Sequence, residues 1–422
     1  MNPQPQHPTP NTQHLVPVDP AELQAHIDEL GEIGKHPEAG LYRALYTDSW
    51  AEAMALLERW LRQAGLETRR DAVGNLFGRL PGTESARVVM TGSHVDTVKQ
   101  GGKYDGALGI HAALAAVKAL HQAHGRPKKT LEVVAFCEEE GSRFPNNFWG
   151  SRAVCGLIEP GEVERAVDAD GCSLAEAMRA HGLDPARVAE ARRGDLDAFL
   201  ELHIEQGRVL ESEGYPLGVV NTITGLRHLR VTVGGRQDHA GATPMDLRID
   251  PMAGAAEMIH RLTAAAADLG RPAVATVGSI GASPGAVNIV PARVTFTVDA
   301  RSPKPDQLRT LLGTVDRILR DVAQQRGLSL QVEVLGEHRP VPLNPDLRRL
   351  LEETAAQLGL RTLEMPSGAG HDSQIMAEGV PAAMLFVPSQ DGKSHRPDEY
   401  TPLEQIVPGV QVLAGALHRL AY

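Results

Sequence analysis

The chain contains no uninterrupted run of about 18 apolar residues, the length that a membrane-spanning helix requires. Its first residues also lack the basic start and the apolar stretch of a secretory signal. Basic residues are in the minority, since 42 Lys and Arg stand against 53 Asp and Glu and give a formal net charge of −11. These absences exclude a membrane span and disfavour nucleic acid as a partner.

Cysteine is scarce as well. Cys137, Cys155 and Cys172 are an odd number of residues without CxxC spacing, which predicts reduced thiols in a cytoplasmic protein rather than a disulfide framework. Cys137 follows an apolar run and is expected to be a packed core thiol.

Signatures of other catalytic chemistries are missing around the obvious candidates. Ser93, Ser142 and Ser151 have no GxSxG elbow around them. The glycine pair Gly234-Gly235 does not belong to a phosphate loop of the GxxxxGK(S/T) or GxGxxG type. We therefore expect water to be the nucleophile of any reaction at this protein.

The length of 422 residues exceeds one ordinary core and predicts two domains. An apolar content of 42% and a charged content of 23% are typical of a globular chain. Residues 1–18 are rich in Pro, Gln, His and Asn and predict a disordered leader.

Hydrophobic periodicity divides the remaining chain. Helical and strand-like segments alternate at first and predict βαβ units in an α/β protein with a mixed, mostly parallel sheet: a helix at 48–64, strands at 87–91 and 130–136, and a helix at 108–121. From 221 to 335 the pattern changes to strands at 229–233, 273–280, 293–299 and 331–335, with helices at 250–266 and 306–326. After residue 340 a helix at 346–358 and a strand at 382–387 follow. The prediction is a split catalytic domain, 19–220 and 336–422, with an inserted α+β domain, 221–335.

Polar residues gather where the first predicted strand ends. His94, Asp96 and Asp105 lie within the stretch GSHVDTVKQGGKYDG, and imidazole and carboxylate are ligands that zinc or manganese accepts. We assign Asp96 the role of orienting the ring of His94. Asp105 is the expected bridge between two ions, because a carboxylate can bind one ion through each oxygen. A turn-forming Asp-Gly pair is the alternative for Asp105.

An acidic run, Glu138-Glu139-Glu140, follows the second predicted strand. Ligands in parallel sheets gather at such strand ends. For Glu138 we expect an exposed acidic position. Of two neighbouring carboxylates, one can bind a cation while the other takes a proton from water; spacing alone leaves open which does which.

Four further histidines lie in polar or glycine-rich segments. His203 in ELHIEQG and His395 in SHRPDEY are candidate ligands, although either alone is more often a surface residue. His239, in the inserted domain, is expected to donate a hydrogen bond to a reacting oxygen rather than to bind metal. His371 lies on the loop GAGHD, where backbone can approach a ligand closely.

These residues belong to stretches that together resemble one family along nearly the whole ordered chain. The stretches are GSHVDTVKQGGKYDG (92–106), CEEEGSRFPNNFWGSR (137–152), HIEQG (203–207), DHAGATPM (238–245), AVNIVPARVTFTVDAR (286–301), SGAGHDSQ (367–374) and FVPSQDGKSHRPDEYT (386–401). The chain resembles the hydantoinase/carbamoylase-type amidases. The resemblance implies a zinc-exopeptidase-like catalytic domain with a ferredoxin-like insertion that serves as a lid and dimerisation domain.

The resemblance also implies roles for the metal-site residues. Two divalent ions per subunit, Zn²⁺ or Mn²⁺, are expected, with Glu139 as the general base. The five implied ligands are His94, Asp105 as the bridge, Glu140, His203 and His395.

The substrate contacts come from the same resemblance. Gln206 and His239 are expected to contact the substrate, His239 across a homodimer, and His371 to lie against a ureido group. Asn288 and Arg301 are expected to hold the substrate carboxylate, for which a guanidinium fork is well suited.

The expected function is hydrolysis of a ureido carbon–nitrogen bond in a small carboxylate. Allantoate, with release of ammonia in purine breakdown, is the first candidate substrate. N-carbamoyl-L-amino acid hydrolysis and a ureidopropionase activity are the alternatives. A metallopeptidase or aminoacylase, and a non-catalytic binding protein on the same scaffold, are more remote ones.

Overall fold

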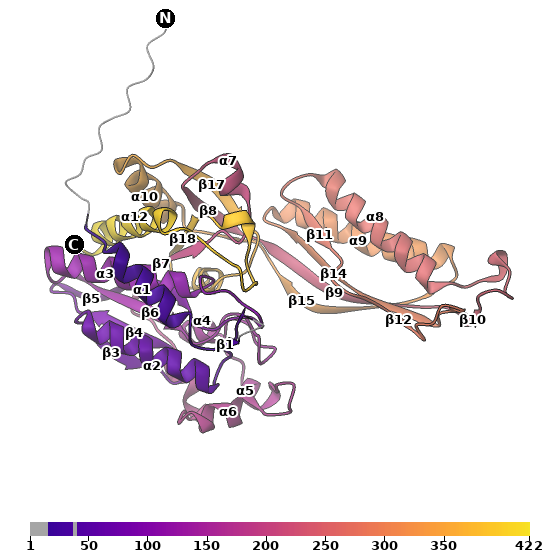
Figure 1. Cartoon of the computed structure of the whole chain (residues 1–422), viewed down its shortest axis with the longest axis horizontal. Coiled ribbons are helices and arrows are strands. Elements are labelled where there is room, and N and C mark those ends of the chain that lie inside the picture. The colour runs from indigo at the N-terminus through magenta and orange to yellow at the C-terminus, as the bar shows by residue number, and fades with distance from the viewer. Residues whose placement is uncertain (1–15, 37–39) are drawn as a thin grey trace, which may run out of the picture. The chain divides into compact units, whose positions relative to one another are not determined.

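The computed structural model describes residues 16–36 and 40–422, which form two compact units (Figure 1). The first unit comprises the residues up to Asn221 together with Leu343–Met365 and Gly370–Tyr422. The second comprises Thr222–Pro342 and Pro366–Ala369, so it reaches Pro342 where the sequence predicts an end at 335. The predicted leader lies outside the described residues as far as residue 15, and Val16 is buried in the core of the first unit.

The larger sheet, most of which belongs to the first unit, follows the order β16-β8-β18-β7-β5-β6-β4-β3, with β17 pairing with β8. Its strands are β3 (Glu67–Arg70), β4 (Leu76–Leu80), β5 (Ser85–His94), β6 (Lys129–Phe136), β7 (Leu196–Ile204), β8 (Leu217–Ile223), β16 (Val341–Pro342), β17 (Thr362–Ser367) and β18 (Ala382–Val387). A separate ribbon pairs β1 (Lys35–His36) with β2 (Gly40–Leu41).

The four central strands, β6, β5, β7 and β18, run parallel, whereas their outer neighbours β4 and β8 run antiparallel. The register places His94 of β5 opposite Phe136 of β6, and Phe386 of β18 opposite His203 of β7. The ends of all four strands therefore meet at one edge of the sheet. This arrangement confirms the predicted mixed, mostly parallel sheet and brings distant polar segments to one place.

Helices flank this sheet (Figure 1). The longest are α1 (Pro20–Leu30), α2 (Asp48–Gln63), α3 (Ala107–His124), α10 (Pro345–Gln357) and α12 (Leu403–Ala421). Shorter ones are α4 (Trp149–Cys155), α5 (Glu162–Arg165), α6 (Leu174–Ala180), α7 (Val209–Glu213) and α11 (Asp372–Met376), with 3₁₀ turns at Pro185–Ala191 and Gln390–Gly392. Among the described residues, no helix combines the length and the apolar character that crossing a membrane requires.

Capping side chains explain where several helices begin. Asp19, Thr47 and Asn344 precede α1, α2 and α10, and each accepts hydrogen bonds from backbone N–H groups of the first turn. Pro20 and Pro345 occupy first helical positions, where no hydrogen-bonding N–H is needed.

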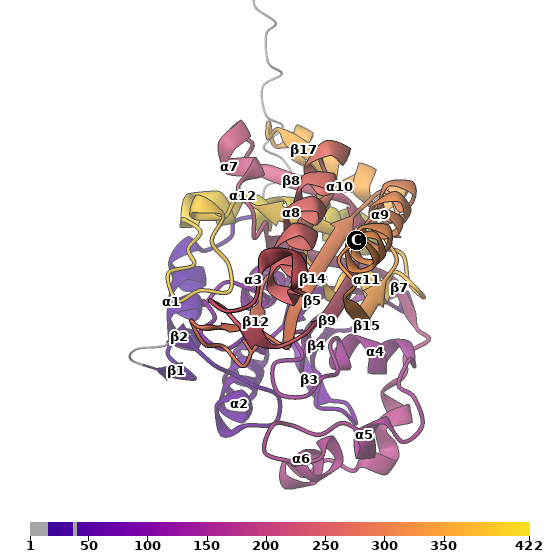
Figure 2. The same ribbon diagram turned by 90° about the vertical axis from the view of Figure 1, so that its right-hand side faces the viewer.

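The strands of the main sheet of the second unit and its two long helices have a β-α-β-β-β-α-β order. This sheet runs β11-β14-β9-β15, with β12 beside β14, and all pairs are antiparallel. The elements are β9 (Gly225–Gly234), α8 (Pro251–Leu269), β11 (Val274–Thr276), β12 (Ile280–Ser283), β14 (Arg293–Ser302), α9 (Pro305–Gln325) and β15 (Ser329–His338). A short ribbon of β10 (Asp238–His239) and β13 (Ile289–Val290) and a 3₁₀ turn at Met245–Leu247 complete the unit. Figures 1 and 2 show α8 and α9 side by side on the sheet, a ferredoxin-like arrangement.

Most of the predicted segments match an observed element, and two differences have a clear cause. The single strand predicted at 273–280 is two strands, β11 and β12, which pair with different parts of β14. The helix predicted at 108–121 continues to His124, because its last turn packs on the C-terminal helix through the ring of His418, 4.6 Å from that of His124.

His111 is a buried residue whose ring packs near His26 and Trp60 without hydrogen bonds to its nitrogens. It belongs to α3 and is 1% exposed. Burial, with the neighbouring positive charges of His26 and Arg43, lowers the pKa of His111 to about 3. The ring is therefore neutral inside the folded protein at acidic pH, where an unfolded chain would protonate it.

This burial makes the protein sensitive to acid. Because the folded pKa lies below the unfolded one, stability is lost as the pH falls through the unfolded value. Between pH 7.5 and pH 5, wild type should lose about 2 kcal/mol more of its free energy of unfolding than His111→Leu. Urea unfolding of both proteins measures this difference. His260→Leu, at an exposed position of α8, is the control and should follow wild type; a His111→Leu variant that also follows wild type contradicts the prediction.

Candidate metal centre

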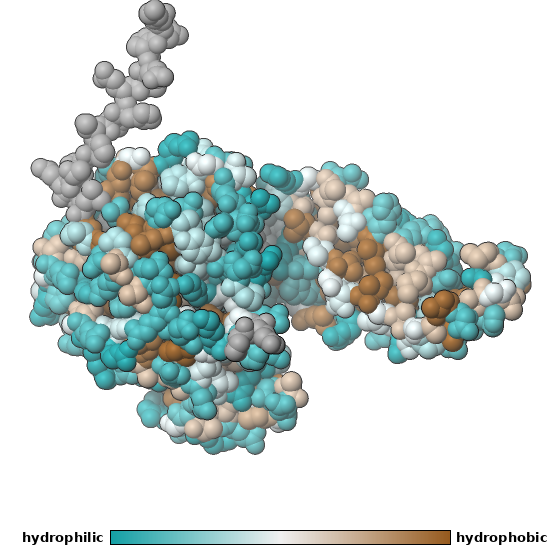
Figure 3. Space-filling model, viewed as in Figure 1, coloured by the Kyte–Doolittle hydropathy of each residue, from teal (hydrophilic) through white to brown (hydrophobic). Residues whose placement is uncertain are grey.

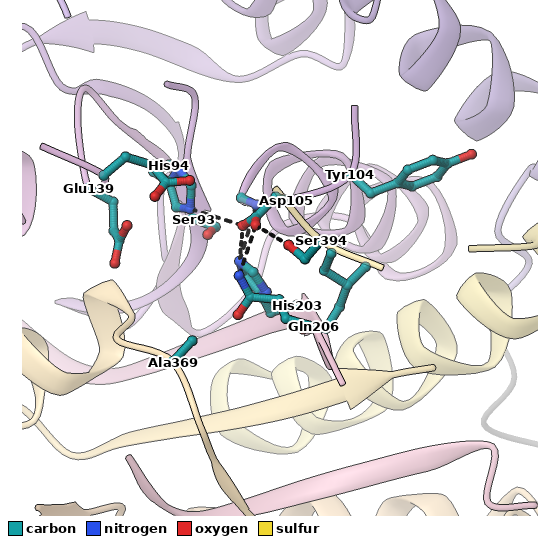
Figure 4. Close-up of polar contacts among 12 residues, drawn as sticks. Ser93, His94, Tyr104, Asp105, Glu139, His203, Gln206, Ala369 and Ser394 are labelled. Carbon is teal, nitrogen blue, oxygen red and sulfur yellow. Dashed lines mark hydrogen bonds and ion pairs between the residues drawn. The ribbon is translucent and has the colours of Figure 1, made fainter. Parts of the chain in front are cut away.

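The predicted ligands meet where the four parallel strands end. His94 is the last residue of β5, Glu139 and Glu140 follow β6, and His203 is near the end of β7. His395 lies in the segment that follows β18, and Asp105 lies in the loop between β5 and α3. Figure 4 shows His94, Asp105, Glu139 and His203 gathered at this edge.

The two carboxylate oxygens of Asp105 face different histidines. Its Oδ1 lies 3.7 Å from His94 Nε2 and 3.3 Å from His203 Nε2. Its Oδ2 lies 3.2 Å from His395 Nε2. Asp105 is thus placed between two sets of nitrogen donors, the arrangement that a bridging carboxylate needs.

Glu139 and Glu140 complete these sets. Ligand atoms of His94, Glu139 and Glu140 lie within 4.8 Å of one another, and so do those of Asp105, Glu140 and His395. His395 Nε2 is 3.5 Å from Glu140 Oε1. We call the His94–His203 side of Asp105 the first donor set and its His395–Glu140 side the second donor set.

Both histidines of the first donor set are held by their Nδ1 atoms. His94 Nδ1 lies 3.2 Å from Asp96 Oδ1 and 3.2 Å from the Asp96 carbonyl. His203 Nδ1 lies 2.9 Å from the Ile204 carbonyl. With the ring proton on Nδ1, each Nε2 keeps a lone pair directed at Asp105, as metal binding requires.

Asp96 also holds the acidic run in place. Its carboxylate is fully buried and accepts the backbone N–H of Glu139 at 2.9 Å and of Glu140 at 3.2 Å. One side chain therefore orients His94 and fixes the loop that carries both glutamates.

Glycine allows the ring of His94 to approach this loop. Gly106 follows Asp105 with φ of 64°, and a Cβ atom there would lie 2.3 Å from the His94 ring. Any other residue would be strained and would displace the ring. Gly106 also donates its N–H to His203 Nε2 at 3.1 Å.

The carboxylates of the centre are poorly solvated. Burial raises the pKa of Glu139 well above its ordinary value, and burial with the nearby Asp105 charge raises the pKa of Glu140 to about 7. Bound cations would favour the ionised forms. The oxygen and imidazole donors, their spacing and their orientation fit two divalent ions.

Glu138 was expected to be exposed, and this expectation is wrong. It is 1% exposed and accepts the backbone N–H of Gly141, and its carbonyl accepts the N–H of Gly150 at 3.1 Å. The acidic run turns inward because the chain after β6 crosses the end of the sheet and not its solvent face.

Two predicted substrate contacts of the first unit lie against the donor sets. Gln206 donates from Nε2 to Asp105 Oδ2 at 2.8 Å, and its backbone has a φ of 59° (Figure 4). The ring of His371 is 4.6 Å from that of His203 and is 2% exposed. A positive φ at a residue with a side chain is uncommon and concentrates at functional sites.

The predicted contacts of the second unit are not all together. His239 lies opposite Ile289 in the β10–β13 ribbon, next to Asn288, whose carbonyl accepts the N–H of Ala240 at 3.0 Å. The chain passes from this ribbon into β14 at Arg293. Just before that point, the N–H of Ala292 donates to the carbonyl of Ser283 at the end of β12. Arg301 is at the other end of β14, eight residues on from Arg293, or about 26 Å.

Arg301 is already engaged in this structure. Its Nε and Nη2 donate to the Asp299 carboxylate at 2.8 and 2.7 Å, and its Nη1 donates to the Gly368 carbonyl at 2.7 Å. Within one chain, Arg301 and Asn288 therefore lie far apart along β14 and the segment before it. Their joint contact with a substrate carboxylate stays a prediction.

Sequence reasoning missed the polar side chains that support the ligands. Ser394 and Glu399 flank His395 in the quoted stretch SHRPDEY, and Glu201 lies two residues before His203. Glu201 is buried and accepts the hydroxyl groups of Ser93 at 2.7 Å and of Ser373 at 2.6 Å. Their nearness to predicted ligands in the sequence was the available signal.

Known proteins resemble this chain along nearly its whole length. A family model described as Peptidase family M20/M25/M40 matches residues 90–419. The allantoate amidohydrolase of Bacillus subtilis (strain 168) is 42% identical over 398 residues, which are 94% of this chain and 97% of that protein. The N-carbamoyl-L-amino acid amidohydrolase of Geobacillus stearothermophilus is 42% identical over 402 residues, 94% of this chain and 98% of that protein. A solved hydantoinase/carbamoylase family amidase from Burkholderia multivorans has a TM-score of 0.89 at 32% identity and covers 96% of this chain and 98% of its own.

Because Asp105 lies between the two donor sets, replacing it should affect the binding of both ions, whereas replacing His395 should affect the binding of one ion. Wild type should hold about two ions after dialysis, Asp105→Ala close to none, and His395→Ala about one. Elemental analysis of the metal-to-protein ratio measures this series. Asp398→Ala removes an exposed carboxylate paired with Arg396 in the same segment and should keep both ions. Loss of both ions from His395→Ala, or retention of one by Asp105→Ala, would contradict the assignment.

Proposed function

The chain belongs to Peptidase family M20/M25/M40, and from that premise we propose that it is a metal-dependent amidohydrolase that cleaves a ureido carbon–nitrogen bond. The observation that carries the proposal is the Asp105 carboxylate between two donor sets, with Glu139 and Glu140 beside it. Allantoate is the first candidate substrate and an N-carbamoyl-L-amino acid the second, because the two relatives with these substrates in their names are equally similar to this chain.

Glu139 is the group proposed to move protons. When bound, two Zn²⁺ or Mn²⁺ ions would polarise the ureido carbonyl and acidify the attacking water. Glu139 removes a proton from that water and passes it to the leaving nitrogen. The loop geometry supports this division, since both glutamates are grouped with His94 but only Glu140 is also grouped with His395 and Asp105.

His239 is proposed to stabilise the developing oxyanion. Its Nδ1 accepts the backbone N–H groups of Gly241 and Ala242, each at 3.1 Å. The neutral ring therefore carries its proton on Nε2, which becomes the donor that this role requires.

A homodimer is proposed to complete the site. His239 and Asn288 lie at the opposite end of β14 from Arg301, so the two groups would serve one substrate only if different chains supplied them. In this arrangement the Arg301 and the ribbon with His239 that serve one substrate come from different chains.

The edge strand β15 supports this assembly. Val332, Val334 and Leu335 are exposed on it. A groove between β15 and α9 is lined by apolar residues, among them Leu319 and Leu330, and by the charged residues Arg227, Asp316, Arg320 and Glu337. Figure 3 shows that apolar residues of the second unit reach its surface among polar ones. An unpaired strand edge with exposed apolar side chains is suited to pairing with a second copy.

Two features favour ureido hydrolysis over the other enzyme classes. The two relatives that are 42% identical to this chain are amidohydrolases by name, and Gln206 donates to Asp105 beside the centre. A non-catalytic binding protein would need no general base, whereas Glu139 is present and buried.

The function is tested by ammonia release. Purified protein loaded with manganese should release ammonia from allantoate or from an N-carbamoyl-L-amino acid, and a dipeptide should remain intact. Glu139→Gln should lower kcat by at least about 100-fold, since it removes the proton acceptor, while the metal-to-protein ratio stays at the wild-type value. Loss of the ions from Glu139→Gln would make it a ligand, and turnover of the dipeptide alone would identify a peptidase.

Mixed dimers test whether His239 acts across the interface. Glu139→Gln and His239→Ala are each expected to be inactive. In a hybrid dimer, one site combines an intact Glu139 with an intact His239 of the other chain, so an equal mixture should regain about a quarter of wild-type activity. If His239 serves its own chain, every site carries one substitution and the mixture stays inactive.

A further inference from the structure

Glu399 joins the segment that carries His395 to the loop that carries Asp105. Its Oε1 accepts the backbone N–H groups of Tyr104 and Asp105, each at 2.9 Å. Asp105 is 294 residues away in the sequence. The Glu399 carboxylate is therefore the support of the loop that presents Asp105, although it lies in the segment that presents His395.

Ser394 connects Glu399 to the bridging carboxylate. Its Oγ lies 2.7 Å from Asp105 Oδ2 and 3.1 Å from Glu399 Oε2. Its single hydroxyl proton is shared between the two carboxylates. The contact with Asp105 is made at the oxygen that faces His395 (Figure 4 shows Ser394 directed at Asp105).

The fit of Glu399 depends on a glycine of the Asp105 loop. A Cβ atom on Gly102 would lie 2.4 Å from both Cβ and Oε1 of Glu399. Glu399 is 4% exposed, so its side chain fills the space that Gly102 leaves. The loop and the segment after β18 are thus shaped to each other without any ion.

The first donor set does not depend on these contacts. His94 is oriented by Asp96 and His203 by the Ile204 carbonyl. Ser394 and Glu399 touch only the Oδ2 side of Asp105 and its backbone. Removing them should therefore act on one donor set and spare the other.

We propose that Ser394 and Glu399 are positioning residues for the second donor set. They hold Asp105 Oδ2 and His395 in place relative to each other before an ion binds there, and so set the affinity for that second ion. The inference rests on the proposed two-ion centre. Without these contacts, binding of the ion must itself order the Asp105 loop and the segment after β18. The free-energy cost of that ordering weakens the binding of the ion.

Metal titration of the full-length protein tests the proposal. Apo protein is titrated with Mn²⁺ and separately with Zn²⁺ against a chelator, and the binding step abolished by His395→Ala defines the second ion. Ser394→Ala and Glu399→Ala should weaken that step about 10- to 100-fold and leave the other step within about threefold of wild type.

Conservative variants separate positioning from mere loss of stability. Ser394→Thr keeps the hydroxyl and should keep wild-type affinity for both ions. Glu399→Gln keeps an oxygen for the two backbone N–H groups and a side-chain amide that can donate to Ser394, so it should also bind like wild type. Ser173→Ala removes an equivalent bond, a serine hydroxyl 2.7 Å from Glu176 in an exposed helix cap, and should leave both steps unchanged.

The outcomes are distinct. If Ser394→Ala weakens both steps equally or neither, the proposal is overturned, and Ser394→Ala decides the matter if Glu399→Ala does not fold. If wild type itself binds fewer than two ions, or shows no binding step that His395→Ala abolishes, the result contradicts the proposed two-ion centre itself. If wild type shows both steps and the variants behave as wild type, the centre stands and only the positioning role fails.

Discussion

The centre depends on how the carboxylate of Asp105 is held. Its backbone N–H is fixed by Glu399, its Oδ2 by Gln206 and Ser394, and its two oxygens point to separate histidines. A carboxylate on a glycine-containing loop would otherwise sample many orientations. The surrounding hydrogen bonds restrict that freedom on the Oδ2 side that faces His395, while His94 and His203 are held by contacts of their own.

The loops that meet around Asp105 also concentrate negative charge at the ends of the central strands. Asp96, Asp105, Glu139 and Glu140 are close to one another and largely withdrawn from water, and the pKa of each of the two glutamates is raised. Asp96 accepts backbone N–H groups, and Arg43, a buried guanidinium, lies near it. Such a cluster is unfavourable as mere packing. It becomes favourable when divalent ions balance the charge, which is why the cluster points to a functional centre.

Much of this protein could be predicted from local patterns. The strand predicted at 87–91 lies inside β5, the strand ending at Phe136 and the helix beginning at Asp48 match their predictions, and periodicity indicates the α+β character of the second unit. Local patterns misplaced Glu138, because burial at a strand end depends on the path of the chain after the strand. They also could not separate β11 from β12, since the break is set by pairing with β14.

The sequence by itself determined the kinds of ligand and the strand ends that carry them, because residue type and hydrophobic period are local properties. Only the tertiary structure decided that Asp105 Oδ1 and Oδ2 face different histidines and that Glu399 supports a loop nearly 300 residues away. These relations arise from the register of parallel strands and the packing of loops across the sheet edge. No window of the sequence contains both partners of such a contact.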